Sequence, residues 1–405
     1  MNKLELLSPA GDIEKLKTAI LYGADAVYIG GASFGLRTAS KNFDFDELCE
    51  GVKYAHSKNA KVYAATNIVA KNRDIKEFKD YLQQLIKAEI DAVIVTDLGL
   101  FSLVREHAPD MEIHISTQAN VTNYESCNFF YKLGAKRIVL ARELPLDSIA
   151  EIREKTNKNL QLEAFAHGAM CISYSGRCLL SNYFTSRDAN AGNCAQSCRW
   201  EYALMEQTRE GEYFPVYEDE GGTFILNSKD LCMVNHIKEM AQAGITSFKI
   251  EGRVKSDYYV AGITDAYRGA IDEYTANPDS TPSPLWYEKV CKVSHRRYYT
   301  GFYMGEPGGQ CYESSIYIRD MEVCAVVTGY DHQKGMAQCV IKNKIVLGDK
   351  LEILSPNQQE QKFVLTKMFS QDNQEIESAP NPMATVYIPL PKIVEGSYIR
   401  RNKIS

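Results

Sequence analysis

The sequence predicts an α/β protein: a (β/α)8 TIM-like barrel with a cysteine-rich insertion between strands 7 and 8, followed by a small C-terminal β-barrel domain. Three observations predict it. Eight β-branched runs alternate with helical patterns over residues 1–255, a long stretch at 167–246 separates the last two runs, and short strands replace the alternation after a proline-rich break. Alternating strands and helices imply a parallel sheet, and eight consecutive units favour a closed barrel over a doubly wound sheet.

The eight predicted strands are short and apolar, and most contain β-branched residues. Between them, apolar side chains recur at the spacing of one helix face. Ile13, Leu16 and Ile20 share such a face after Asp12, a candidate N-cap. The predicted strands are Leu4–Ser8, Ala26–Gly30, Val62–Ile68, Ala92–Asp97, Ile113–Ala119, Arg137–Arg142, Leu160–Ala166 and Ser247–Gly252.

The stretch before the eighth strand is expected to open onto the C-terminal face of the barrel, where TIM-barrel sites are built. Within it, Tyr202–Thr208 and Gly222–Leu226 predict a hairpin, and Leu231–Ala243 predicts a helix. Residues 276–284 contain three prolines and predict a break. The predicted domains are the barrel at 1–275, with an insertion at 168–230, a linker at 276–315 and the β-barrel domain at 316–405. The strands of the last domain are predicted at Met321–Tyr330, Ala337–Lys344, Lys350–Leu354, Gln361–Met368 and Thr385–Pro389.

The composition, 45% hydrophobic and 24% charged, is that of an ordinary globular protein. No apolar run approaches the roughly 18 residues of a membrane helix, and the N-terminus has no signal-peptide core, so no membrane partner is expected. Eleven cysteines without a secretion signal favour a reducing cytoplasm over a disulfide framework. The formal net charge of −6 restricts any nucleic-acid site to a local basic patch.

Four cysteines in the insertion are candidate metal ligands. Cys171, Cys178, Cys194 and Cys198 follow the spacing Cys-x6-Cys-x15-Cys-x3-Cys. Four thiolates can hold one [4Fe–4S] cluster or one structural zinc ion. The absence of a Cys-x2-Cys pair favours the cluster, while zinc and unligated thiols are the alternatives. Cys232 is a fifth thiol, expected to be a buried helical residue that could replace one ligand.

Charged residues near the predicted strand ends are candidates for catalysis at the barrel mouth. A buried charge is costly unless it is paired or used, so a ring of structural salt bridges is the alternative reading. The histidine of the fifth strand could serve as an acid or base, or be structural. The catalytic candidates are His114, Arg142, Glu163, His167 and Glu251.

Substrate-binding candidates come from polar strand ends and from the insertion. Arginine can grip a carboxylate or phosphate with its planar guanidinium, and an aromatic side chain can stack on a base. Alternation along a predicted fifth strand would place His114, Ser116 and Gln118 on one side of it. The binding candidates are Asn67, Gln118, Arg177, Trp200 and Arg253.

Residues 163–181 read EAFAHGAMCISYSGRCLLS. This segment resembles the signature of peptidase family U32, with Cys171 and Cys178 at its two cysteine positions. The segments LLSPAG at 6–11, YGADAVYIGG at 22–31, ISTQAN at 115–120, NSKDL at 227–231 and KIEGR at 249–253 also resemble blocks of that family. The resemblance covers the barrel fully and the C-terminal domain more loosely.

The resemblance implies an oxygen-sensitive [4Fe–4S] cluster and an RNA-modifying enzyme, since the chain looks most like the branch that forms 5-hydroxyuridine at the wobble position of tRNA. It also implies tRNA as partner and prephenate, a small dicarboxylate, as co-substrate or oxygen-donor metabolite. A homo-oligomer or a paralogous partner subunit is a further expectation from the resemblance. Exposed basic residues would contact RNA; besides Trp200 the candidates are Arg187, Arg199, Lys255, Lys342, Lys344, Lys362, Arg400, Arg401 and Lys403.

Two other functions stay open. The family name implies a peptidase, but the sequence contains no His-Glu-x-x-His motif of a zinc protease. A Cys–His protease built on Cys171 and His167 is still compatible with the sequence. The other alternative is a non-catalytic scaffold with a structural cluster.

Overall fold

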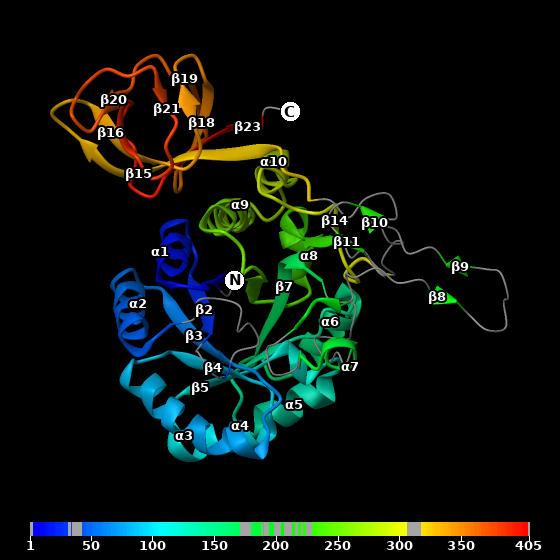
Figure 1. Cartoon of the computed structure of the whole chain (residues 1–405). Helices are drawn as coiled ribbons and strands as arrows, with labels where there is room; N and C mark the ends of the chain where they lie inside the picture. The colour runs from blue at the N-terminus through cyan, green and yellow to red at the C-terminus, as the bar shows by residue number, and fades with distance from the viewer. Residues whose placement is uncertain are drawn as a thin grey trace.

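The structure is a computed structural model in which residues 3–30, 34, 43–170, 180–187, 189, 194–197, 204–205, 213–214, 218–219, 222–223, 229–305 and 317–403 are described. Eight parallel strands close into a barrel, as the sequence predicted, because the last of them pairs with both the first and the seventh (Figure 1). They are β1 (Glu5–Pro9), β2 (Ala26–Gly30), β3 (Lys61–Thr66), β4 (Ala92–Val95), β5 (Glu112–Ile115), β6 (Arg137–Val139), β7 (Gln161–Ala169) and β13 (Ser247–Ile250).

Helices surround the strands on the outside of the barrel (Figure 1). Asp12 caps the first helix as predicted, since its Oδ1 accepts the Lys15 backbone N–H at 2.9 Å. The helices around the barrel are α1 (Ile13–Leu21), α2 (Phe45–Ser57), α3 (Asn72–Lys87), α4 (Leu98–His107), α5 (Tyr124–Lys132), α6 (Leu146–Glu154), α8 (Ile237–Gln242) and α9 (Asp257–Ala276).

The two faces of the strands bury different side chains. Leu6 and Val27 point outward into the main core between strands and helices. Their neighbours Leu7 and Tyr28 belong to a separate cluster that fills the barrel. This alternation follows from the two-residue period of a strand. The barrel is therefore a packed core, and its site must lie at an end rather than along its axis.

Strand β7 is longer than its neighbours and leaves the barrel at its C-terminal end. There it pairs with the antiparallel strand β12 (Asp230–Cys232), which pairs in turn with β14 (Tyr298–Tyr299). The predicted helix at Leu231–Ala243 is therefore wrong in its first half. A 3-10 turn, Val234–His236, follows β12, and only then does α8 begin. Pairing with β7 satisfies backbone groups that a short helix would have left at its end.

The described parts of the insertion contain helix α7 (Leu180–Thr185) and two small hairpins. Strand β8 (Leu204–Met205) pairs with β9 (Tyr213–Phe214), and β10 (Glu218–Asp219) pairs with β11 (Gly222–Thr223). The single hairpin predicted from Tyr202–Thr208 and Gly222–Leu226 is therefore wrong, because each of those segments pairs with a nearer one. Short local pairings close smaller loops and lose less chain entropy.

The segment that we expected to be a linker, 276–315, carries helix α10 (Pro284–Cys291) and strand β14. Ser283 caps α10 and Pro284 occupies its first turn, where proline fits best. The helix packs on α9, and Trp286 lies against Gly269, where a Cβ would be only 2.3 Å from the ring. The described part of this segment thus belongs structurally to the barrel.

The C-terminal domain is a curled antiparallel sheet with its own apolar core, as predicted. Its main sheet runs in the order β19-β18-β23-β15-β16-β22-β20, and β17 pairs with β21. The strands are β15 (Met321–Asp331), β16 (Met336–Ile341), β17 (Ile345–Val346), β18 (Lys350–Leu354), β19 (Gln361–Val364), β20 (Phe369–Ser370), β21 (Ser378–Ala379), β22 (Thr385–Pro389) and β23 (Tyr398–Asn402). The domain lies beside α1, α9 and α10 (Figure 1).

Candidate active site at the barrel mouth

Polar side chains from the ends of β3 and β5 meet at the C-terminal face of the barrel. Strand β5 ends at Ile115, so the expectation of a longer strand carrying Ser116 and Gln118 is wrong. Ser116 instead caps a 3-10 turn, Thr117–Ala119. Its Oγ accepts the Gln118 backbone N–H and the Asn67 side-chain N–H, both at 3.3 Å. Two predicted binding residues, Asn67 and Gln118, are thereby brought together.

Arg142 and Glu251 also lie at this face. The Arg142 guanidinium donates to the Ala169 carbonyl at 3.2 Å and lies 5.4 Å from the centre of the Phe165 ring. The backbone of Glu251 is fixed by a hydrogen bond from its N–H to the His167 carbonyl and by one accepted from Tyr259. These contacts hold the ends of β6, β7 and β13 together. The catalytic roles of Arg142 and Glu251 stay predictions.

Arg253 follows β13 and is buried. Its carbonyl lies so close to the backbone of the β1–α1 loop that a Cβ on Gly11 would be 2.1 Å from it. Only glycine allows so close an approach, which explains why the segment LLSPAG at 6–11 ends in glycine. Arg253 is therefore held at the mouth by the loop after β1, and its predicted role in binding a substrate is still an expectation.

Glu163 lies inside the barrel, away from the mouth. It is fully buried, and its carboxylate bonds Arg137 at 2.9 Å and Lys249 at 2.7 Å. Arg137 also binds Glu5 at 2.5 Å. Burial alone would raise the pKa of Glu163, but Lys249 and Arg137 outweigh it and lower that pKa. A carboxylate paired in this way is better explained as part of a structural salt bridge than as a catalytic group.

His114 belongs to the same interior layer. Its ring packs edge-on against Tyr63 with centres 4.7 Å apart, and Nε2 lies 3.6 Å from Glu112 Oε2, at the N-terminal end of β5. Burial and the nearby Arg137 charge lower the pKa of His114. The histidine therefore points away from Gln118 and the mouth, contrary to the expectation that the two share one side of a strand.

His167 lies on the outer side of β7, between that strand and α9. Its Nδ1 is 3.3 Å from the Tyr267 hydroxyl and its Nε2 is 3.5 Å from the Tyr298 hydroxyl. A β-bulge shifts the register of β7 on β13 just before this residue, which turns its side chain out of the barrel. Burial lowers the pKa of His167 to about 3, with His295 and Lys255 adding to the effect. It is thus a neutral, buried histidine away from the mouth.

Three residues of the interior charge network were missed by the sequence reasoning: Glu5, Arg137 and Lys249. The signal was present, because each is a charged residue inside a strand that is otherwise apolar. Lys249 lies 4.5 Å from the centre of the Tyr28 ring, and burial lowers its pKa. It sits two residues before Glu251 and forms part of the layer beneath the mouth.

Of the four candidate cluster ligands, Cys171, Cys178 and Cys198 lie outside the described residues, as do Arg177 and Trp200. Cys194 is described and exposed, and its Sγ accepts the Gln196 backbone N–H at 3.3 Å. The neighbouring Ala195 N–H donates to Ser181 Oγ at 2.9 Å. This bond holds the Cys194 segment against the first turn of α7, to which Ser181 belongs.

The described contact of Cys194 suits a thiolate metal ligand, and the cluster itself stays a prediction. Backbone N–H donation to sulfur stabilises a thiolate, and thiolates are the usual cluster ligands. Cys232 differs from Cys194 because it is buried on β12 and burial raises the pKa of its thiol to about 12. That environment matches the expectation of an inert packing residue, although the residue lies on a strand and not on a helix.

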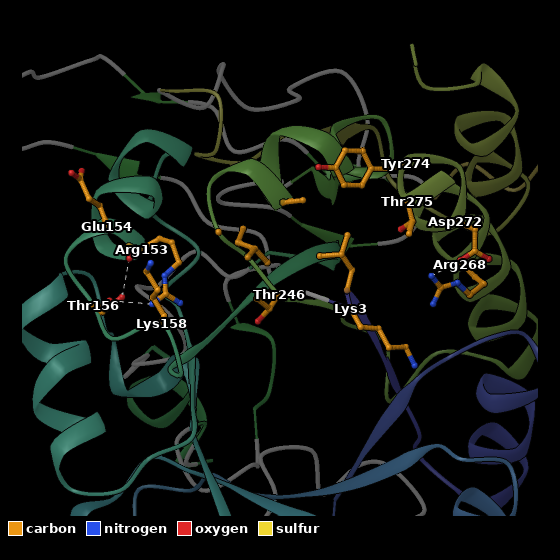
Figure 2. Close-up of a pocket in the computed structure, with 14 residues that line it drawn as sticks. Lys3, Arg153, Glu154, Thr156, Lys158, Thr246, Arg268, Asp272, Tyr274 and Thr275 are labelled. Carbon is orange, nitrogen blue, oxygen red and sulfur yellow. Dashed lines mark hydrogen bonds and ion pairs between the residues drawn. The ribbon is translucent and has the colours of Figure 1, made fainter. Parts of the chain in front are cut away.

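A pocket of about 850 Å³ lies at the other end of the barrel (Figure 2). Its lining includes Lys3 and Thr246, which precede β1 and β13, so it opens on the N-terminal face. Arg153 bonds the Leu160 carbonyl at 2.6 Å, and Arg268 pairs with Asp25 at 2.9 Å. These arginines stabilise turns, and the pocket is separate from the predicted site.

Two family profiles match the chain. Peptidase family U32 covers residues 11–312, and the peptidase family U32 C-terminal domain covers residues 319–401. The chain belongs to peptidase family U32. The barrel and the curled sheet are thus the two regions that this family's profiles describe.

Relatives of this U32 chain carry names of two kinds. The tRNA hydroxylation protein P1 of Bacillus subtilis is 38% identical over 99% of this chain and 95% of its own. The 23S rRNA 5-hydroxycytidine C2501 synthase of Escherichia coli is 39% identical over 67% of this chain and 40% of its own. A Methanocaldococcus jannaschii protein named as an uncharacterized protease is 46% identical over 75% of this chain and 74% of its own.

The predicted RNA-contacting residues of the U32 chain divide into two groups. Arg400 is buried and paired with Glu352 and Glu360, and Arg401 pairs with Glu322 at 2.9 Å, so both are part of the fold. Exposed lysines at 342, 344 and 362 stay available as candidates. Among the described residues no helix is long and apolar enough to span a bilayer.

Proposed function

We propose that this U32 chain is an iron–sulfur enzyme that hydroxylates C5 of the wobble uridine in tRNA, with prephenate as co-substrate. The observation that carries the proposal is the 38% identity to tRNA hydroxylation protein P1 over 99% of the chain. The similarity to a 5-hydroxycytidine synthase supports the same chemistry, since both names describe hydroxylation of RNA.

The proposed reaction inserts one oxygen atom into the C5–H bond of the base, a two-electron oxidation in which an oxygen-donor co-substrate, here proposed to be prephenate, gives up that atom and is itself reduced by two electrons. A [4Fe–4S] cluster held by Cys171, Cys178, Cys194 and Cys198 would supply redox chemistry. The dicarboxylate would need cationic partners, and Arg142 and Arg253 at the mouth are suited to this because a guanidinium binds a carboxylate through paired N–H groups. The RNA would reach the mouth with its base turned out of the stack.

The test begins with protein purified without oxygen. We expect about four irons per chain with matching acid-labile sulfide, lost in Cys171→Ser and Cys198→Ser. Cys232→Ser is the matched control, because that thiol is buried on β12 as an apolar packing residue and its loss should leave the iron content unchanged. Next, 5-hydroxyuridine is measured by mass spectrometry in tRNA from cells lacking the gene and cells carrying each variant.

Loss of 5-hydroxyuridine in the deletion and in both cysteine variants, with recovery by Cys232→Ser, would support the proposal. Unchanged 5-hydroxyuridine in the deletion would contradict it. The alternative is a peptidase, which the name of the archaeal relative favours. A peptidase activity that needs Cys171 but survives removal of iron would establish that alternative.

A further inference from the structure

The amide of Asn67 at the mouth has a fixed orientation. Its Nδ2 donates to Ser116 Oγ at 3.3 Å, and its backbone carbonyl accepts the Thr96 hydroxyl at 3.3 Å. The remaining group, Oδ1, is buried and accepts no hydrogen bond from any part of the chain that the structure describes. One Nδ2 hydrogen is used by Ser116, and the amide still offers Oδ1 as a hydrogen-bond acceptor.

Asn120, four residues after Ser116 along the chain, repeats this feature. It ends the 3-10 turn in the left-handed conformation, with φ of 53°, which asparagine tolerates better than most residues. Its Oδ1 is also buried without a donor among the described residues. Buried acceptors are rarely left unsatisfied in folded proteins. Two such oxygens, one on the residue bonded to Ser116 and one four residues after Ser116, at the end of the barrel that carries sites, indicate a missing ligand rather than a packing defect.

The chemistry of these two oxygens restricts the ligand. An amide oxygen accepts hydrogen bonds and cannot donate them, so a carboxylate or phosphate would gain nothing here and would be repelled. A neutral planar group with an N–H donor fits. Uracil carries such a donor at N3. The C4 carbonyl carbon lies between N3 and C5 in the ring, so a hydrogen bond to N3–H leaves C5 accessible for reaction.

We propose that Asn67 and Asn120 form a base-reading subsite in which their side-chain oxygens accept the N3–H of the target uracil. The inference rests on the proposed function and assigns the substrate base to the β3–β5 side of the mouth. Arg142 and Arg253, after β6 and β13, are then left for the anionic co-substrate. The asparagine side of the mouth would thus bind the neutral base, and the arginine side would bind the anionic co-substrate.

The test compares two RNA hairpins that copy the anticodon stem-loop, one with uridine and one with 3-methyluridine at the wobble position. Binding to the full-length, anaerobically purified protein is measured by fluorescence anisotropy. Methylation removes the N3–H donor and puts a methyl group in its place, so we expect about tenfold weaker binding, the factor that corresponds to about 1.4 kcal/mol. The quantity compared is the ratio of the Kd for the 3-methyluridine hairpin to the Kd for the uridine hairpin. Asn67→Leu and Asn120→Gly should bring this ratio close to one, because they weaken binding of the uridine hairpin alone.

Two matched controls accompany these variants. Asn67→Asp keeps an oxygen acceptor in the same place and should retain a preference for uridine. Asn59→Gly removes another left-handed asparagine, with φ of 57°, from an exposed turn before β3 at the far end of the barrel, and should keep the full ratio. Equal binding of the two hairpins by the unaltered protein would overturn the subsite while leaving tRNA hydroxylation standing. Failure to bind either hairpin, with normal 5-hydroxyuridine in cells lacking the gene, would overturn both.

Discussion

At the scale of single residues, the barrel is organised around charges that neutralise one another beneath the mouth. Glu5 binds Arg137, Arg137 binds Glu163, and Glu163 binds Lys249. Buried ions are tolerated only when each has a partner and further hydrogen bonds. Glu5 meets this condition, since the Tyr63 hydroxyl donates to it at 2.7 Å. The network forms a rigid polar layer two residues below Glu251.

The first stability prediction concerns Glu5. Burial alone would raise its pKa, but Arg137 and hydrogen bonds from Tyr63 and Ser247 lower it from 4.5 to about 2. A carboxyl whose pKa falls on folding stabilises the protein above pH 4.5 and loses that contribution as the pH falls towards 2. Glu5→Gln should therefore cost about 3 kcal/mol at pH 7 and flatten the loss of stability below pH 4.5, measured by urea unfolding across pH.

Glu50→Gln provides the comparison for that experiment. Glu50 pairs with Lys17 at 2.9 Å on the surface, where a salt bridge contributes about 0–1 kcal/mol. Its variant should follow the pH profile of the unaltered protein. If both variants shift the profile equally, the interior network is not the source of the acid sensitivity.

At the scale of elements, the end of β7 decides where the insertion begins. Gly168 adopts φ of 114°, and a Cβ there would be 2.7 Å from the Glu251 carbonyl. Gly168 also pairs with Leu231 where β7 meets β12, and Cys171 follows three residues later in the sequence. A positive φ and a close backbone contact both require glycine at this position.

Gly168→Ala should therefore push β7 away from Glu251. We expect a loss of more than about 2 kcal/mol of stability, because backbone strain and steric overlap add, together with a lower iron content if the cluster is present. Gly305→Ala is the control, since Gly305 has a similar φ of 108° but nothing within 4 Å of its Cβ position. Equal stability losses in thermal unfolding would show that strain alone, and not the contact with Glu251, matters.

At the scale of the whole molecule, the C-terminal domain is fixed to the barrel by specific contacts. Tyr22 packs with Leu354 and Tyr398, and its hydroxyl lies 3.0 Å from the carbonyl oxygens of Leu354 and Gly396. Arg400 donates to the Tyr258 hydroxyl of α9 at 2.8 Å. Buried contacts of this kind favour one fixed arrangement over a flexible tether.

Arg400→Met tests this joint. Glu352 and Glu360 would keep only Lys292 as a cationic partner among the described residues, and breaking a buried pair costs about 3–5 kcal/mol. We expect a separate unfolding transition for the C-terminal domain by calorimetry. Arg401→Met, which removes only pairs within that domain, should cost about 1 kcal/mol and keep the original number of transitions. Identical thermograms for the two variants would refute the role of Arg400 at the joint.

The order of strands and helices was determined by the sequence alone, because hydrophobic period and capping residues are local properties. Strands such as Ala26–Gly30 were predicted to the residue, and Asp12 was predicted as a cap. The family followed from the segment at 163–181 in the same way. The helix predicted from Leu231 was wrong because that segment pairs with β7, and such a partner is invisible to local pattern.

Only the tertiary structure decided which predicted site residues meet. Alternation alone would keep Phe165 and His167 on one face, but a bulge against β13 turns the histidine outward. Asn67 and Ser116 are far apart in sequence, and they come together because parallel strands of a closed barrel end at one rim. Side-chain identity sets what a residue can do, whereas strand closure and register determine which partners it has.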